Sequence, residues 1–136
     1  MSDIHGIAVQ EYDPAIEGKD AMPEPAELVV CTDVLEHIEP VHINAVLRHL
    51  RELTQKRLFV SIYCRPAGKT LADGRNAHLL IRPPVWWRQK LLEFFQILSW
   101  EERGPVVAAE LVAKKHMGRV KPAGRRAMGA RAAPMA

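Results

Sequence analysis

The sequence predicts an α/β domain built on a mostly parallel sheet. Two continuous apolar runs, at residues 28–32 and 58–63, are rich in β-branched residues and have the length of buried strands. Between them, apolar residues recur at three- and four-residue steps, as on one face of a helix. The order strand, helix, strand predicts two parallel strands joined by a helical crossover.

The predicted crossover helix begins near Pro40, which suits a first helical turn, and ends at Gln55 and Lys56. Its apolar face is formed by Ile43, Val46, Leu47, Leu50 and Leu53. The opposite side is mostly polar, with His42, Arg48, His49, Arg51 and Glu52. We therefore expect the apolar face to pack on the sheet and the polar side to meet solvent.

The segment before the first apolar run predicts a short strand and a connector. Residues 6–13 have the pattern of a strand that ends in acidic residues, and Pro14 stops it. Residues 17–27 contain Gly18, Pro23 and Pro25, which are typical of turns.

The second half of the chain predicts a loop, a helix and a pair of strands. Residues 64–82 form a long connection of the kind that is often functional. A second helix is expected over residues 84–95, with Trp87, Leu91, Leu92 and Phe95 facing inward. Residues 96–101 and 106–113 then read as two strands joined by Gly104 and Pro105, and we expect an antiparallel pair at the sheet edge.

Composition indicates one folded domain and a basic tail. The chain has 136 residues, 48% of them hydrophobic, which suits a single core. Seven of the 19 Lys and Arg residues lie from Lys114 onward, where no Asp or Glu occurs. The rest of the chain is acidic, so the basic balance belongs to the tail. We expect a domain over residues 1–115 and a basic, disordered tail over residues 116–136. The tail either stays solvated or makes nonspecific contact with nucleic acid or another acidic surface.

The sequence carries no signal for export or for a membrane span. No apolar run approaches the roughly 20 residues that cross a bilayer. The N-terminus lacks a basic start followed by an apolar stretch. Cys31 and Cys64 are too few for a disulfide framework, and we expect both to be reduced. These features predict a cytoplasmic protein.

Polar side chains follow the predicted strands, where open α/β sheets bind their ligands. Asp13 follows the first strand and Asp20 lies in the connector. Asp33, Glu36 and His37 follow the strand at residues 28–32. A carboxylate in such a place can accept hydrogen bonds from the two hydroxyls of a ribose. This edge is therefore a candidate site for a ligand that contains a ribose.

The run AELVVCTDVLEHI at residues 26–38, preceded by Asp20, Met22 and Pro23, resembles class I S-adenosylmethionine-dependent methyltransferases. Members often show an Asp, a Leu/Met-Pro pair, an Asp/Glu-Leu-Val strand and a Leu-Glu-His-Ile turn that opens a helix. The resemblance extends over roughly residues 7–113 and is most specific at residues 26–38. It implies a Rossmann-like three-layer sandwich and methyl transfer from S-adenosylmethionine to an unidentified acceptor.

The resemblance also implies roles for individual residues. Asp13 would bind the ribose of the cofactor, and Asp20 and Met22 would flank its adenine. Thr32 and Asp33 would line the methionine part and the methyl-transfer pocket. Glu36 and His37 would form the turn near that pocket.

One part of the family pattern is absent. The glycine-rich turn that follows the family's first strand should precede Asp13, but only a few residues do so. We therefore expect a sheet that lacks the first strand and this turn, as in an N-terminally truncated enzyme. The alternative is a non-catalytic remnant that acts as an interaction module, with a second copy or another chain covering the open sheet edge.

Residues near the expected pocket have structural alternatives as well. Arg75, Asn76 and His78 could orient an acceptor, or belong to a hydrated surface loop. His37 and His78 are weak candidates for a catalytic base, and His37 could equally shape the pocket. The order of Glu36, His37 and His42 does not match a His-Glu-x-x-His motif, so the pattern predicts no metal site. Cys31 has no apparent activating histidine, and we expect no nucleophilic cysteine.

Overall fold

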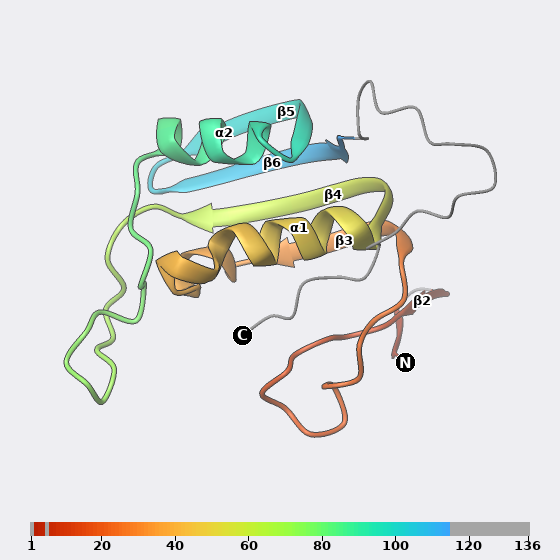
Figure 1. Cartoon of the computed structure of the whole chain (residues 1–136), viewed down its shortest axis with the longest axis horizontal. Coiled ribbons are helices and arrows are strands. Elements are labelled where there is room, and N and C mark those ends of the chain that lie inside the picture. The colour runs from red at the N-terminus through yellow and green to blue at the C-terminus, as the bar shows by residue number, and fades with distance from the viewer. Residues whose placement is uncertain (1, 5, 115–136) are drawn as a thin grey trace, which may run out of the picture.

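The computed structural model describes residues 2–4 and 6–114 of the chain, and it forms a four-stranded sheet with two helices and a separate hairpin (Figure 1). The strands are β1 (Ser2–Ile4), β2 (Ile7–Val9), β3 (Ala26–Thr32), β4 (Thr54–Tyr63), β5 (Phe95–Arg103) and β6 (Val106–Ala113). The helices are α1 (Ile43–Leu53) and α2 (Pro84–Leu92), and two 3₁₀ turns, η1 (Leu35–His37) and η2 (Pro40–His42), precede α1. The basic tail predicted at residues 116–136 lies outside the described residues.

The main sheet has the strand order β3-β4-β6-β5. β3 and β4 are parallel and are joined through α1, while β6 runs antiparallel to both β4 and β5. Three strands therefore share one direction, so the sheet is mostly but not purely parallel. The predicted crossover and the predicted antiparallel pair at the sheet edge are both confirmed.

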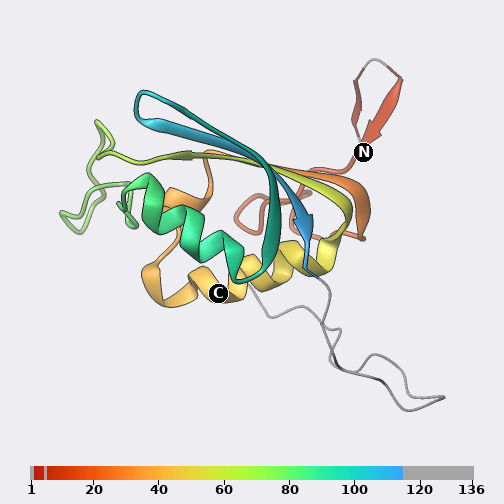
Figure 2. The ribbon, with the colours of Figure 1, turned by 90° about the horizontal axis from the view of Figure 1, so that it is seen from above.

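Both helices cover the same face of this sheet, as the view from above shows (Figure 2). On that face Val60 of β4 lies between Cys31 of β3 and Ala109 of β6, and all three are buried. The helices contribute fully buried Leu47 and Trp87 to the same core. The hydrophobic free energy of this domain therefore comes from one layer of helices packed on one layer of strands.

The expected three-layer sandwich is wrong for the described part of the chain. Leu28 and Val30 of β3 are 59% and 60% exposed, and Phe59, the β4 partner of Val30, is 39% exposed. These side chains point to the face that neither helix covers, because residues alternate between faces along a strand. The apolar run at residues 28–32 thus marks a strand that is buried on one face, not on both.

The first predicted strand does not join the main sheet. Residues 7–9 do form a strand, but it pairs antiparallel with β1, opposite Ser2–Ile4, in a hairpin of its own. β3 is consequently an edge strand in the described part of the chain. Beyond its free edge Figure 1 shows the long connector that leads from the hairpin to β3.

Most helix predictions are confirmed, with several corrections. The first helix ends at Leu53, because Gln55 and Lys56, its predicted end, lie in β4. Ile43, Val46, Leu47 and Leu50 are buried as expected. His49, however, is only 1% exposed instead of facing solvent, and the ring of Tyr12 lies edge-on to it with 6.0 Å between centroids. In the second helix Leu92 is 40% exposed, and Phe95 is buried as the first residue of β5. No helix among the described residues is long and apolar enough to cross a membrane.

Candidate functional site

The turn after β3 places a carboxylate at the edge of the sheet where the parallel strands end. Asp33 has a φ of 56°, a left-handed conformation that Asp tolerates better than most residues other than Gly. Its backbone N–H donates to the carbonyl of Ser61 on β4 at 3.1 Å. The Ser61 hydroxyl also faces Asp33, with Oγ 3.5 Å from Oδ1. The end of β4 therefore holds this sharp turn and leaves the Asp33 side chain exposed.

The next residues turn back into the core as η1. Leu35 and Glu36 are both 0% exposed. Oε1 of Glu36 accepts a hydrogen bond from the backbone N–H of Tyr63 at 3.1 Å, and its backbone carbonyl accepts one from the N–H of Leu80 at 3.0 Å. Oε2 of Glu36 is buried and has no hydrogen-bond partner. A charged residue thus joins β3, β4 and the following loop while one of its oxygens stays unsatisfied.

The connection at residues 64–83 is an ordered loop with its own hydrogen bonds. Asn76 bridges its two ends: Oδ1 accepts from the N–H groups of Ala67 and His78, each at 2.9 Å, and Nδ2 donates to the carbonyl of Ala67 at 2.9 Å. Thr70 also forms a β-bridge with Asn76. Asn76, a predicted substrate-side residue, therefore has a structural role that sets the position of His78.

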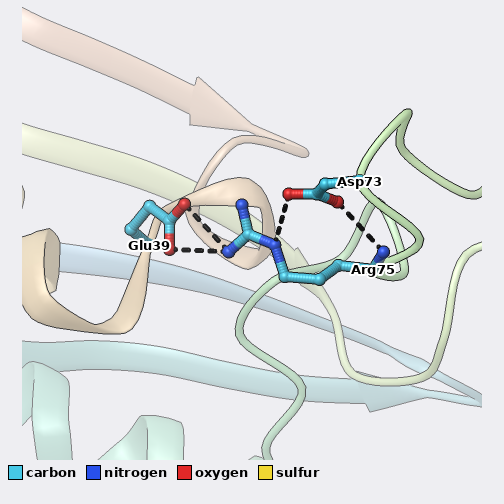
Figure 3. Close-up of polar contacts among 3 residues, drawn as sticks. All are labelled: Glu39, Asp73 and Arg75. Atoms are coloured by element: carbon cyan, nitrogen blue, oxygen red, sulfur yellow. Dashed lines mark hydrogen bonds and ion pairs between the residues drawn. The ribbon is translucent and has the colours of Figure 1, made fainter.

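Arg75 ties the same loop to the start of the α1 region (Figure 3). Its Nε lies 2.8 Å from Oδ2 of Asp73, and its Nη1 lies 3.0 Å from each carboxylate oxygen of Glu39. The Asp73 carboxylate also accepts the backbone N–H of Arg75 at 3.0 Å, and these contacts hold the pKa of Asp73 below its usual value. The Arg75 guanidinium is thereby occupied by protein carboxylates.

Two histidines meet where η1 and the loop come together. The rings of His37 and His78 lie edge to face, with centroids 4.7 Å apart and an interplanar angle of 83°. The ring of Tyr63 lies 5.3 Å from that of His78. Two residues 41 positions apart in the chain are thus brought together at the end of β4.

These side chains line a shallow pocket of about 320 Å³. Its walls are Asp33, Glu36, His37, Tyr63, His78 and residues 66–68. Four of these, Asp33, Glu36, His37 and His78, are predicted site residues. Tyr63 was not predicted as a site residue, although its place as the last residue of a strand in the parallel pair is the signal that could have identified it.

The residues predicted to hold the adenosine lie elsewhere. Asp13 follows the hairpin strand β2, and its Oδ1 accepts the backbone N–H of Ala15 at 2.9 Å. Asp20 accepts the N–H of Gly18 at 3.3 Å, and Met22 is 56% exposed. All three belong to the connector beside the free edge of β3, so the structure does not bring them into the pocket beside Asp33 (Figure 1). Thr32, the last residue of β3, is exposed next to that pocket.

Neither cysteine is placed for nucleophilic chemistry. Cys31 is buried within β3, and burial raises the pKa of its thiol to about 12. Burial likewise raises the pKa of the Cys64 thiol, at the start of the loop, to about 11. A thiol with such a pKa stays protonated near neutral pH and is a poor nucleophile.

Comparison with known proteins gives matches in structure but none in sequence. No model of a known protein family matches the chain, and no curated protein matches its sequence.

Two solved structures share the fold. A crystal structure of the PH0226 protein from Pyrococcus horikoshii OT3 superposes with a TM-score of 0.51 and 12% identity, over 65% of this chain and 51% of that one. The structure of a DhpI–SAH complex superposes with a TM-score of 0.54 and 16% identity, over 68% of this chain and 50% of that one. The chain therefore spans about half the length of these proteins, and at this identity the likeness shows a shared fold.

Proposed function

We propose that this chain takes part in methyl transfer from S-adenosylmethionine to an acceptor that is still to be identified. The observation that carries the proposal is the fold shared with DhpI, whose structure was solved with SAH. SAH, S-adenosylhomocysteine, is what remains of S-adenosylmethionine after the methyl group has left. The pocket at the ends of β3 and β4 supports the proposal, because open α/β sheets bind ligands at this edge.

The chemistry of the pocket fits the methionine end of such a cofactor. The sulfonium of S-adenosylmethionine is a cation, and the carboxylates of Asp33 and Glu36 line the pocket. A volume of about 320 Å³ is at the lower end of small-molecule sites. The pocket therefore suits the methionine part, with Thr32 and Asp33 beside it. Asp13, Asp20 and Met22 are the proposed adenosine contacts, and they lie outside this pocket, in the connector.

The bound cofactor supplies a methyl group on a positively charged sulfur, which is already a good leaving group. The protein then needs mainly to align the acceptor with that group and to exclude water. His37 and His78 line the pocket, and in the metal-free chain Nε2 of either ring is free to accept the proton that the acceptor loses. Glu36 and Tyr63 form the floor that fixes η1 against β4.

Titration calorimetry of the purified chain with S-adenosylhomocysteine and with S-adenosylmethionine tests the proposal. We expect saturable heat with both ligands. Absence of heat at millimolar ligand would contradict cofactor binding by this chain.

Two substitutions separate the proposed subsites. Asp33→Asn keeps a residue that tolerates a positive φ and removes one charge, so it should weaken S-adenosylmethionine more than the neutral S-adenosylhomocysteine. Asp13→Asn should weaken both ligands equally, because the adenosine is common to them. Glu17→Gln, in the same exposed connector as Asp13, is the matched control and should leave both affinities unchanged.

A second candidate function is an interaction module, and the bare face of the sheet favours it. Leu28, Val30 and Phe59 expose apolar surface beside the free edge of β3. Exposed apolar patches and unpaired strand edges are typical of protein–protein contacts. A second copy of this chain, paired through β3, would cover both features at once.

The oligomeric state tests this candidate. Sedimentation should show a dimer that Val30→Lys converts to monomer, because a charge there cannot be buried without a partner. Val85→Lys is the control, since Val85 is also 60% exposed but lies on α2, on the covered side of the sheet. If the chain is monomeric at all concentrations, a second copy of the chain does not cover this face.

A further inference from the structure

Three side chains with metal-binding atoms converge at one side of the pocket. Glu36 and His37 come from η1, and His78 comes from the loop between β4 and α2. One ligand atom from each lies within 4.8 Å of those from the other two. The sequence pattern could not indicate this group, because the separation of 41 positions between His37 and His78 matches no usual metal motif.

The backbone holds both imidazoles in the same tautomer. Nδ1 of His37 lies 3.0 Å from the carbonyl oxygen of Ala77, and Nδ1 of His78 lies 2.6 Å from that of Arg65. A carbonyl oxygen only accepts, so each Nδ1 carries hydrogen and donates it. In the neutral rings the lone pair is therefore on Nε2. Histidines that bind metals are oriented in this way, by a hydrogen bond from the nitrogen that does not touch the ion.

The third side chain is a buried carboxylate that lacks a partner. Glu36 is 0% exposed, Oε1 accepts the Tyr63 N–H, and Oε2 has no hydrogen bond. Among the described residues, no Lys, Arg or His forms an ion pair with it. Burying an unpaired carboxylate is costly, and a cation in contact with its free oxygen would offset this cost. This is an indication of a ligand that does not depend on the histidines.

We propose that Glu36, His37 and His78 bind one divalent transition-metal ion, with Zn²⁺ as the best match. Two imidazoles and one carboxylate are the donors of open zinc sites, whereas Mg²⁺ and Ca²⁺ prefer oxygen ligands. The pocket leaves the ion accessible on one side, where a water molecule or a ligand oxygen completes the coordination.

The required movement is small. Ligand atoms around a tetrahedral zinc ion are about 3.3 Å apart, given bonds of about 2.0 Å. One potential ligand atom from each of the three side chains lies within 4.8 Å of the other two, about 1.5 Å more than this spacing, so the side chains have to draw together to bind the ion. His37 is exposed and His78 is half-buried, so the protein packs less tightly around these two rings than around the buried Glu36.

Metal titration of the full chain in the absence of any methyl donor tests the proposal. We expect equilibrium dialysis to show one tightly bound Zn²⁺ per chain, and Co²⁺ in its place to give the visible absorption of a four- or five-coordinate ion. Because neither readout involves S-adenosylmethionine, the result stands apart from the test of methyl transfer.

Matched variants assign the ligands. Glu36→Gln retains an oxygen for the Tyr63 N–H, and His37→Gln changes an exposed residue, so both should fold. Each should weaken Zn²⁺ binding by at least about 100-fold, since even residues that merely orient ligands are worth 10- to 100-fold. His42→Gln, in the neighbouring η2, should retain full affinity. Absence of tight binding, or tight binding that both variants preserve, overturns the proposal.

Discussion

The backbone N–H of Tyr63 donates a 3.1 Å hydrogen bond to Oε1 of the buried Glu36. This contact joins the last residue of β4 to the turn that follows β3. Through its own carbonyl, Glu36 also receives the N–H of Leu80 from the far end of the loop. One side chain and its backbone therefore fix three segments around the candidate site.

Substitutions of Glu36 should separate its hydrogen bond from its charge. Glu36→Ala leaves the Tyr63 N–H without its partner and should lower the free energy of unfolding by about 1–3 kcal/mol. Glu36→Gln keeps an acceptor and removes an unpaired buried charge, so in the absence of metal it should be at least as stable as the wild type. Urea unfolding of the metal-free proteins measures both. If Glu36→Ala and Glu36→Gln lower the free energy of unfolding equally, the charge of Glu36 stabilises the fold and its hydrogen bond to Tyr63 does not.

The ion pairs of Arg75 should control local order more than global stability. Arg75→Gln frees the loop from Glu39 and Asp73, and exposed ion pairs contribute little to the whole fold. Hydrogen–deuterium exchange should become several-fold faster at Leu71 and Gly74, whose N–H groups bond within this loop, while the thermal midpoint changes little.

Salt and a matched variant check that interpretation. High ionic strength should reduce the difference between Arg75→Gln and the wild type, because it screens exposed charges. Arg103→Gln removes a comparable exposed pair with Glu101 in the β5–β6 hairpin and should leave exchange in the loop unchanged. If exchange at Leu71 is the same in all three proteins, the Arg75 contacts do not order the loop.

The main sheet and its crossover helix were predictable because each rests on local pattern. The apolar runs at residues 28–32 and 58–63 and the helical phasing from Ile43 require only that one face be buried. The same patterns cannot tell how many faces are covered. Leu28 and Val30 have the composition of a strand between two layers, yet the described chain supplies helices for one side only.

The candidate site was predictable in its parts but not as an assembly. The residues after β3 were expected at the sheet edge because parallel strands end together there. The approach of His78 to His37 depends on the path of a loop set by Asn76, which no periodicity encodes. Asp13 was expected at the end of a strand of the main sheet, but the strand before it, β2, pairs with β1 instead. The sequence of so short a strand does not show which strand it will pair with.

Burial of His49 should make stability depend on pH. Burial lowers the pKa of His49, because the imidazolium loses its hydration, so the native state holds the ring neutral. The unfolded chain protonates it near its ordinary pKa of about 6.5. The contribution of neutral His49 to the free energy of unfolding is fully present above about pH 6.5. It is lost as the pH falls below this value, because the unfolded state then takes up a proton that the native state does not. The slope reaches at most about 1.4 kcal/mol per pH unit.

His49→Phe keeps a planar ring against Tyr12 and removes the titration. Between pH 7 and pH 5, urea unfolding should show a smaller loss of stability for this variant than for the wild type, and other titrating groups cancel in the comparison. Arg48→Gln changes the exposed neighbouring residue, and between pH 7 and pH 5 this variant should lose as much free energy of unfolding as the wild type does. Parallel curves for wild type and His49→Phe would mean that the native state protonates His49 freely.

The two thiols should be alkylated slowly in the folded protein, and Cys64 should react faster than Cys31. Their raised pKa values, about 12 for Cys31 and about 11 for Cys64, leave roughly one molecule in a thousand or fewer as thiolate at pH 8. In urea both should return toward the ordinary value of about 8.5 and react at least about 100-fold faster with an alkylating reagent. Cys64 is half-buried and has the lower pKa, so it should react before Cys31. The kinetic phase of alkylation that disappears in Cys64→Ser is the reaction of Cys64. If the native wild type and the native Cys64→Ser variant are both alkylated rapidly, the reactive thiol is Cys31. That result would contradict the burial of Cys31 within β3.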